Sequence, residues 1–378
     1  MSVEPDYSKY FLRGTGSYAC TFGSSNPGDP LIQIKDTTTA EKNRNLITSL
    51  QLPNINRIQK YLIYPNPNIK PVPKNLNRGS CTLEEPLSLV EIIDGGKDLH
   101  VLKVPPEDIF SFFKGFINIF DGLLHLHASK IAHLDVKPEN MVGKKEPDGT
   151  YKLRLIDFGL SVDINTFKDY HKFYYDRVTP FNYPYWAYDL RILHNINFSF
   201  ICRNDVSKIK DIEKFKNTLD KYKFPSSELV NKLDAMLIVN IKENITGREK
   251  EILLKSDVFA LGLSLYELIK RLTNVDVQST AMGLIMEMCD PNPFTRLSLE
   301  EAKTKYMNEI LPVIKTYYPP LPAPLTLRIP PSLRLTPPPN VSAPVRSQEG
   351  GNMKKTYKRK LHRKRRKNIT KRVRPSKI

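Results

Sequence analysis

The sequence predicts an α+β fold with two lobes, a small β-rich N-terminal lobe and a large α-helical C-terminal lobe, followed by a disordered C-terminal extension. Three observations lead to this fold class. Short apolar runs broken by Gly, Pro and Asn fill residues 10–100, which favours a small sheet. Helical spacing of apolar residues begins at Pro105 and continues in the helical lobe. After Tyr318 the composition no longer supports a packed core.

Two apolar segments in the N-terminal lobe, residues 1–93, are expected strands. Leu31-Ile-Gln-Ile34 is the first. Leu89-Val-Glu-Ile-Ile93 is the second, and it ends where Asp-Gly-Gly follows, because glycine favours turns.

The second lobe, residues 94–318, is expected to be mostly helical. Pro-Pro-Glu-Asp at residues 105–108 is typical of a helix start, and apolar residues then recur three and four positions apart up to Ser129. The segment from Ser256 to Ile269 is apolar on nearly every face, so we predict a buried helix with Ser256 as its N-cap. Residues 203–253 are rich in lysine but keep helical spacing, which indicates helices on a surface.

Basic residues concentrate at the C-terminus. The 378-residue chain has 58 Lys and Arg against 40 Asp and Glu, a formal charge of +18, yet 14 of the basic residues and no acid lie within residues 354–378. The remainder is nearly balanced, which excludes a chain whose whole surface is shaped by nucleic acid.

Two segments make up the extension. Residues 319–353 are a proline-rich linker, with 10 prolines in positions 319–344, and residues 354–378 are a basic disordered tail. We expect nonspecific contact with nucleic acid or acidic proteins through Lys354–Lys377, together with nuclear entry. A purely solvating tail is the alternative.

The four cysteines, Cys20, Cys81, Cys202 and Cys289, are far apart in the sequence. No pair has the spacing of a zinc site or a redox dithiol, so we interpret them as free thiols in a reducing compartment. The N-terminus lacks the apolar core of a signal peptide, and no uninterrupted apolar run is long enough to span a membrane. We therefore expect an intracellular protein, in the nucleus or cytoplasm, without a membrane partner.

One constellation of polar residues carries chemistry. The run His133-Leu-Asp-Val-Lys-Pro-Glu-Asn140 is followed by Ile156-Asp-Phe-Gly159, and we predict a hairpin between them that turns at residues 146–149. Phosphoryl transfer depends on positioning and on electrostatic stabilisation of negative charge. A carboxylate and an amide oxygen are hard ligands that suit Mg²⁺, and a second carboxylate can accept the proton of an attacking hydroxyl.

These motifs, in their order over roughly residues 10–315, resemble those of the eukaryotic protein kinase family. The resemblance implies that Asp135 is the catalytic base and that Lys137 neutralises the transferred phosphoryl group. It also implies that Asn140 and Asp157 hold magnesium ions. The implied reaction is transfer of the γ-phosphoryl group of ATP to Ser or Thr of protein substrates, with ATP and Mg²⁺ as cofactors, because Lys-Pro-Glu-Asn is similar to the serine/threonine-directed version.

Upstream segments are similar to the nucleotide-binding elements of that family. Gly14-Thr-Gly16 resembles the start of the glycine-rich loop that covers the phosphates of ATP, although alanine replaces the third glycine. Lys35 follows an expected strand and matches the lysine that holds the α- and β-phosphates. The backbone near Glu91 and Ile93 matches the hinge that binds adenine.

Two further motifs match structural positions of the family. Asp257 and Gly262 match a motif whose aspartate anchors the backbone of the catalytic loop. Arg296 matches an arginine that closes a structural ion pair. The segment Thr179–Asp189 lacks the Ala-Pro-Glu ending of the family, and Asp189 is the candidate partner of Arg296 in the place of that glutamate. We also expect a lysine-rich insertion near residues 190–253.

Two other departures concern activity. Counting back from Leu52-Pro-Asn-Ile55 puts Asn43 where active kinases carry the helical glutamate that pairs with the strand lysine. Glu41 is the nearest acid, so either Glu41 is used through a local distortion, or the pair is missing, or the register differs. Leu134 stands where many kinases carry arginine, which implies activity that is not switched on by phosphorylation of the activation segment.

The alternative function is a pseudokinase or scaffold that binds partners through its insertion and basic tail. The missing glutamate favours this alternative, whereas the intact set Lys35, Asp135, Lys137, Asn140 and Asp157 favours an enzyme. A small-molecule kinase of the aminoglycoside or choline type is disfavoured by the Lys-Pro-Glu run and the late arginine motif. The Asn-, Lys- and Ile-rich texture resembles kinases of large DNA viruses, which would place the protein in a host cell or virion.

Overall fold

The chain divides into two units, residues 1–322 and 323–378, and every residue placed by the computed structural model belongs to the first. The segments that the structure describes are residues 5–15, 19–26, 29–38, 40–41, 59–63, 68–165, 183–196, 207–221, 223–224, 229, 240, 243–244 and 247–320. The basic tail, nearly all of the proline-rich linker, and Gly16, Asn43 and Cys202 therefore lie outside the described residues.

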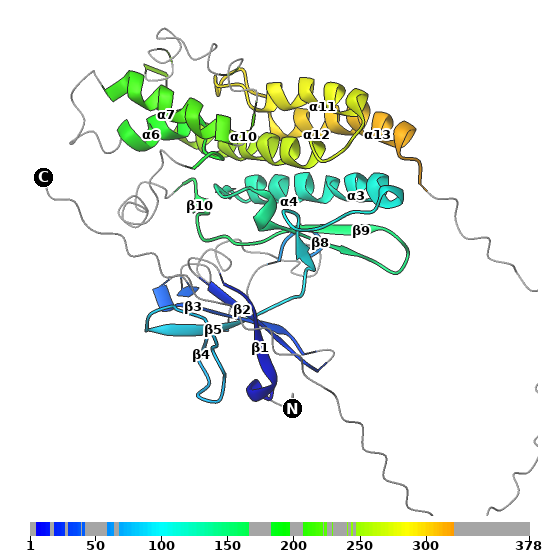
Figure 1. The fold of residues 1–378 in the computed structure, drawn as a ribbon. Helices are drawn as coiled ribbons and strands as arrows, with labels where there is room; N and C mark the ends of the chain where they lie inside the picture. Colours follow the sequence, from blue (N-terminus) through cyan, green and yellow to red (C-terminus); the bar gives the residue numbers. More distant parts are fainter. Residues whose placement is uncertain are drawn as a thin grey trace, which may run out of the picture. The chain divides into compact units, whose positions relative to one another are not determined.

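An antiparallel sheet with the strand order β1-β2-β3-β5-β4 forms the N-terminal region (Figure 1). The 3-10 helix η1 (Tyr7–Lys9) precedes it, and its strands are β1 (Tyr10–Thr15), β2 (Ala19–Ser24), β3 (Leu31–Asp36), β4 (Lys70–Pro71) and β5 (Leu87–Ile92). Both predicted strands are confirmed, as β3 and β5, and these two strands pair along their whole length. Ile32 and Ile34 of β3 are fully buried, as the alternation of a strand with one covered face requires.

A disulfide bond lies in the hydrophobic cluster of this sheet. Cys20 of β2 is bonded to Cys81, which precedes β5, and the two Cα atoms are 6.0 Å apart. The interpretation of four free thiols is therefore wrong for this pair, because the fold joins segments that are 61 residues apart in the chain. Cys289 is a buried free thiol. The cluster comprises Tyr7, Tyr10, Cys20, Phe22, Ile32, Ile34, Leu76, Cys81, Leu87 and Leu89.

The predicted helix of residues 105–129 forms as three consecutive pieces. They are η2 (Pro106–Asp108), α3 (Ile109–Gly115) and α4 (Ile117–Ala128). By length and composition alone, Pro106–Ala128 is the single described helix that is apolar enough to cross a membrane. The search for an uninterrupted apolar run did not find it, because polar residues interrupt its apolar residues. Its aromatic side chains Phe112, Phe113, Phe116 and Phe120 are buried in the protein core, which accounts for its composition.

The buried helix predicted at residues 256–269 is longer than expected. The structure has α10 (Glu249–Ile269), with Arg248 at the N-cap position. Ser256 is not an N-cap, because it lies inside the helix and its Oγ donates to the carbonyl oxygen of Ile252 at 2.8 Å. Ile252 and Leu253 are buried as well, so the apolar surface that stabilises the helix extends about one turn upstream of Ser256.

The remaining helices pack with α10 around a second hydrophobic cluster, separate from that of the sheet. They are α6 (Tyr188–Ile196), α7 (Ser207–Lys221), α11 (Val275–Met288), α12 (Leu299–Lys305) and α13 (Leu311–Tyr317), and the π-helical segment η5 (Tyr306–Ile310) joins the last two. The helix predicted in the lysine-rich segment is confirmed as α7, in which Phe215 and Leu219 are buried.

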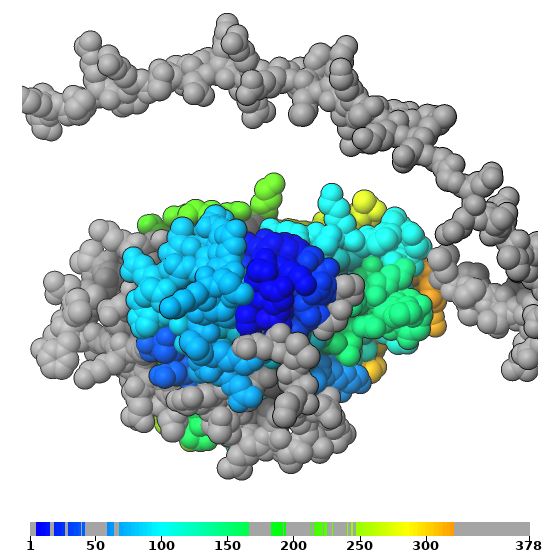
Figure 2. All heavy atoms as spheres, turned by 90° about the horizontal axis from the view of Figure 1, so that it is seen from below, coloured from blue at the N-terminus to red at the C-terminus, as the bar shows by residue number. Residues whose placement is uncertain are grey.

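Short strands hold the two polar motifs next to these helices. Strands β6 (Lys97–Asp98), β8 (Met141–Lys145) and β9 (Tyr151–Leu155) form one small sheet, and β7 (Ile131–Ala132) pairs with β10 (Val162–Asp163). The predicted hairpin is β8–β9, whose turn contains Gly149 at a φ of +84°. The 3-10 helix η3 (Pro138–Asn140) precedes it. Seen from below, the N-terminal strands (dark blue) and the segment up to β5 (lighter blue) share one face (Figure 2).

Replacement of Cys81 by serine is expected to lower the melting temperature. A bond that closes a 61-residue separation restricts the unfolded chain and stabilises the fold by up to about 4 kcal/mol in the chain-entropy treatment. Thermal unfolding followed by circular dichroism, with and without a reductant, measures this effect. The reductant should bring the wild type down to the Cys81→Ser variant and leave the variant unchanged. Equal melting temperatures of the variant and the oxidised wild type would contradict the prediction.

Candidate active site

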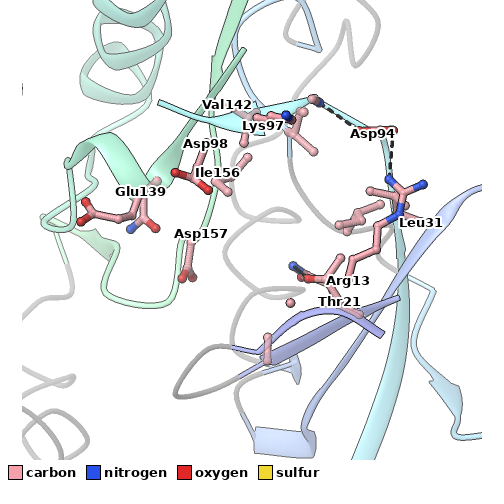
Figure 3. A pocket seen from close by; sticks show the side chains of 18 of the residues that line it. Arg13, Thr21, Leu31, Asp94, Lys97, Asp98, Glu139, Val142, Ile156 and Asp157 are labelled. Carbon is pink, nitrogen blue, oxygen red and sulfur yellow. Dashed lines mark hydrogen bonds and ion pairs between the residues drawn. The ribbon is translucent and has the colours of Figure 1, made fainter. Parts of the chain in front are cut away.

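A pocket of about 740 Å³ lies between the N-terminal sheet and the strands that carry the polar motifs. Its walls come from β1, β2 and β3, from the connection between β5 and β6, and from the two motifs. In Figure 3, Arg13 and Thr21 approach from the sheet, and Glu139 and Asp157 lie on the opposite side. The predicted binding residues that line the pocket are Gly14, Lys35, Ile93, Asn140 and Asp157.

Lys35 presents a buried ammonium group to this pocket. It lies on β3, paired in the sheet with Ala19 of β2, the strand that follows the glycine-rich segment. Lys35 is 4% exposed and forms no ion pair among the described residues. Glu41 is exposed and does not pair with it. Because a buried charge without a counter-charge is costly, a bound anion is the partner that this position favours.

The two other predicted nucleotide-binding elements have different outcomes. Gly14 lines the pocket in β1, opposite Thr21. Ile93 lines it as well, whereas Glu91 does not, because its carboxylate turns to Lys70 of β4 and forms an ion pair at 2.8 Å. The prediction at Glu91 therefore concerns its backbone alone.

Sequence reasoning missed an ion pair at the edge of the pocket. Arg13 of β1 reaches Asp94, after β5, with 3.5 Å between Nη1 and Oδ2 (Figure 3). The second carboxylate oxygen of Asp94 accepts the N–H of Gly96 at 2.9 Å. A side chain adjacent to the glycine-rich segment thus joins the sheet to the segment after β5. The sequence contains no spacing signal for this contact.

Asp135, Lys137 and Asn140 form one hydrogen-bonded cluster. The ammonium group of Lys137 lies 2.9 and 3.1 Å from the two carboxylate oxygens of Asp135. The amide nitrogen of Asn140 donates to Asp135 Oδ2 at 2.6 Å and to the Asp135 carbonyl oxygen at 2.9 Å. Asn140 also lines the pocket, so it connects the predicted base and cation, which are not among the lining residues, to the pocket.

The carboxyl group of Asp135 is suited to receive a proton. It is 6% exposed, and burial raises its pKa above the ordinary value, with the nearby negative charge of Asp157 acting in the same direction. The ammonium of Lys137 opposes this shift. A carboxylate with a raised pKa is a stronger base than an exposed one, which is what acceptance of a hydroxyl proton requires.

Asn140 and Asp157 have the donor atoms that magnesium prefers. The side-chain nitrogen of Asn140 donates to Asp135, and the side-chain oxygen Oδ1 of Asn140 has no hydrogen bond among the described residues. Asp157 adopts a φ of +60°, and its Oδ1 accepts the N–H of Gly159 at 3.1 Å. No group of three or more His, Cys, Asp and Glu suited to a metal occurs in the described part of the chain. This sparse oxygen set fits Mg²⁺, which usually completes its shell with water and phosphate.

A second functional side chain that the motifs did not indicate is Tyr183. Its hydroxyl donates to Oδ1 of Asp135, and its ring centroid lies 5.3 Å from the ammonium nitrogen of Lys137. Tyr183 belongs to the segment in which the family ending is absent, so no motif marked it. The only available signal was its position shortly before Asp189.

The predicted anchoring of the catalytic loop by Asp257 is confirmed. Its carboxylate, fully buried in α10, accepts the backbone N–H groups of His133 and Leu134, each at 2.8 Å. The ring of His127 lies 3.0 Å from the same carboxylate. These contacts hold Leu134 at a φ of +59°, which a leucine rarely adopts without support.

The predicted pairing of Asp189 with Arg296 is also confirmed. Arg296 Nη2 lies 2.7 Å from Asp189 Oδ1, and both side chains are fully buried. Arg296 Nε donates to the carbonyl oxygen of Asp290 at 2.8 Å, and Nη1 donates to that of Lys255 at 3.0 Å. Because the other N–H groups of Arg296 are also hydrogen-bonded, the cost of burying this ion pair is offset. The pair connects α6 to the segment after α11.

Comparisons with known proteins agree with these motifs. A family model described as the protein kinase domain matches residues 82–181. Human death-associated protein kinase 2 is 36% identical over 80 residues, which are 20% of this chain and 21% of that protein. Calcium-dependent protein kinase 6 of Plasmodium berghei (strain Anka) is 32% identical over 113 residues, which are 29% of this chain and 7% of that protein. The mouse (Mus musculus) serine/threonine-protein kinase DCLK2 is 48% identical over 44 residues, 12% of this chain and 6% of that protein. The chain thus spans about a fifth or less of these curated relatives.

Replacement of Asp257 by asparagine is expected to lower the free energy of unfolding by about 3 kcal/mol, because an amide cannot supply the charged acceptor that the backbone N–H groups require. Urea unfolding of the two proteins measures the difference. Glu84→Gln is the matched control, since Glu84 is exposed and has no hydrogen bond or ion pair among the described residues, and surface changes usually alter stability by less than about 0.5 kcal/mol. Unfolding free energies that agree among all three proteins would contradict the anchoring role.

Proposed function

Because this chain belongs to the eukaryotic-type protein kinase superfamily, we propose that it transfers the γ-phosphoryl group of ATP to serine or threonine hydroxyls of protein substrates. The observation that carries the proposal is the convergence of Lys35, Asn140 and Asp157 on one pocket. The hydrogen bonds from Asn140 to Asp135 add the proton acceptor to that set. Phosphoryl transfer needs such a combination of cation, oxygen ligands and base.

Each residue has a distinct task in the proposed reaction. Lys35 binds the α- and β-phosphates, and Gly14, with Gly16, forms part of the loop that covers them. Backbone groups at Glu91 and Ile93 bind adenine. Asp135 orients the acceptor hydroxyl and takes its proton, while the ammonium of Lys137, 2.9 Å from Asp135, offsets the charge of the transferred phosphoryl group.

Magnesium would be held by Asn140 and Asp157. When bound, the ion neutralises the negative charge of the phosphates. The protein's contribution is to hold these two oxygen donors in place, Asn140 through its amide hydrogen bonds to Asp135 and Asp157 through the N–H of Gly159.

The proposal includes the arrangement of the chain. We propose two lobes, residues 1–93 and 94–318, with the nucleotide between them. The two hydrophobic clusters support this division, except that Leu62 of the first range packs in the cluster of the helices. Residues 319–353 are proposed as a disordered linker and residues 354–378 as a disordered tail for nonspecific contact with nucleic acid or acidic proteins.

Serine/threonine direction is supported by the Lys-Pro-Glu-Asn run and by the name of the DCLK2 relative. An intracellular location, nuclear or cytoplasmic, is proposed on the basis of the basic tail. The disulfide between Cys20 and Cys81 opposes this location, because such bonds persist mainly in oxidising compartments.

A specific observation favours a second candidate, a pseudokinase or scaffold. Lys35 has no acidic partner among the described residues, and active kinases position this lysine with a glutamate. A scaffold would bind nucleotide or partners without turnover.

Replacement of Asp135 by asparagine is expected to lower phosphoryl transfer by about 10²- to 10⁴-fold, the usual contribution of a general base. The assay supplies γ-labelled ATP, Mg²⁺ and generic basic or acidic acceptor proteins. Asp157→Ala should also abolish labelling, because a magnesium ligand is lost. Asp148→Asn, in the exposed β8–β9 turn, is the matched control and should label at the wild-type rate. Equal labelling by the wild type and Asp157→Ala would reject the metal ligand, and nucleotide binding by an inactive wild type would favour the scaffold.

Replacement of Lys35 by methionine is expected to weaken ATP binding by about 10- to 100-fold, which corresponds to the loss of a charged hydrogen bond of 1.5–3 kcal/mol. Glu41→Gln should leave the affinity unchanged, because Glu41 is exposed and unpaired with Lys35. Titration of each variant with a fluorescent ATP analogue gives the dissociation constants. If Glu41→Gln weakens binding as much as Lys35→Met does, Glu41 is the missing partner after all.

A further inference from the structure

A hydroxyl of the chain itself lies where the hydroxyl of a substrate would contact the proposed catalytic base, Asp135. Tyr183 donates its phenolic O–H to Oδ1 of Asp135, and this is the single Ser, Thr or Tyr hydroxyl bonded to that carboxylate among the described residues. The other carboxylate oxygen accepts the amide of Asn140 at 2.6 Å. A hydroxyl that is to be phosphorylated must lie within hydrogen-bond reach of its base, and Tyr183 meets that requirement.

The backbone around Tyr183 is fixed to the catalytic loop. Arg191 of α6, itself buried, donates from Nη2 to the carbonyl oxygen of Tyr183 at 2.5 Å and from Nε to that of Trp186 at 3.1 Å. The indole N–H of Trp186 donates to the carbonyl oxygen of Leu134, next to Asp135, at 3.0 Å. The hydroxyl contact is therefore part of a connected set of hydrogen bonds and not the chance position of one exposed side chain.

The surroundings of Tyr183 also suit a phosphoryl acceptor. Its ring centroid lies 5.3 Å from the ammonium of Lys137, the group assigned to offset the charge of the phosphoryl group. Burial raises the pKa of Tyr183 well above its usual value, so the phenol keeps its proton until a base removes it. Asp135 is the base that contacts it.

We propose that Tyr183 is a phosphoacceptor for the chain's own active site. This inference rests on the proposed kinase function and extends it from serine and threonine of other proteins to one tyrosine of the same chain, whose hydroxyl is bonded to the base. The phenolic oxygen of Tyr183 forms a bond to the γ-phosphorus of ATP, the bond from that phosphorus to the bridging oxygen of the β-phosphate breaks, and ADP leaves. The phenolic proton passes to Asp135 and then to solvent. The products are ADP and phosphotyrosine at position 183.

A neighbouring tyrosine provides a matched control. Tyr185 lies two residues further along and packs against Tyr183 with ring centroids 5.6 Å apart. Its hydroxyl donates to Glu267 of α10 instead of to Asp135. The two side chains share a segment and a residue type, and they differ in which carboxylate they contact, so the proposal predicts phosphate on Tyr183 and not on Tyr185.

Phosphopeptide mapping of the full-length chain tests the proposal. Phosphatase-treated protein is incubated with ATP and Mg²⁺, the phosphatase having been removed, and the sites are identified by mass spectrometry over time. Phosphate is expected on Tyr183, with a first-order rate constant that does not change on dilution because the reaction is intramolecular. Tyr183→Phe and Asp135→Asn should abolish this phosphopeptide, and Tyr185→Phe should retain it.

Two results separate the possible failures. A wild-type preparation that labels added protein but leaves Tyr183 unmodified, or that modifies it at a rate proportional to protein concentration, overturns the intramolecular acceptor and leaves the kinase function standing. A preparation that labels neither Tyr183 nor added protein overturns the kinase function together with this inference. The wild-type measurement alone decides both, so the test does not depend on whether the variants fold.

Discussion

The buried carboxylate of Asp257 is the contact on which the candidate site depends. It accepts the N–H groups of His133 and Leu134 at 2.8 Å and lies 3.0 Å from the ring of His127. Without these donors, a charge inside α10 would cost several kcal/mol. With them, the left-handed backbone at Leu134 becomes tolerable, and the following residue, Asp135, faces Asn140. The positions of Asp135 and Asn140 therefore depend on Asp257, a side chain that does not line the pocket.

Much of the candidate site could be predicted because its signals are local or have fixed spacing. Short apolar runs that end at polar residues or glycine indicate the strands at Leu31–Asp36 and Leu87–Ile92. The catalytic-loop and metal-binding motifs are separated by a hairpin, and the hairpin returns the chain so that Asn140 and Asp157 reach one pocket. The pairing of Asp189 with Arg296 could be expected because the late arginine motif resembles that of the family and Asp189 stands near the place of the family's glutamate.

The features that sequence reasoning missed depend on contacts between distant segments. The bond between Cys20 and Cys81 requires the arrangement of the sheet, which cysteine spacing does not contain. Ser256 has the chemistry of an N-cap, but the burial of Ile252 upstream outweighs that local preference and extends α10. The contact of Tyr183 with Asp135 depends on the path of a segment whose sequence departs from the family.

The covalent bond between Cys20 and Cys81 makes the intervening polypeptide a ring. That ring contains β3 with Lys35, and also the stretch between Lys35 and Leu52, where the family resemblance puts Asn43 at the position of the glutamate that pairs with this lysine. A protease that cuts the ring once releases no fragment, because both new ends stay attached through the two sulfur atoms. Such a nicked molecule would keep β2 joined to the segment before β5, and it would separate into two pieces on a gel only after reduction.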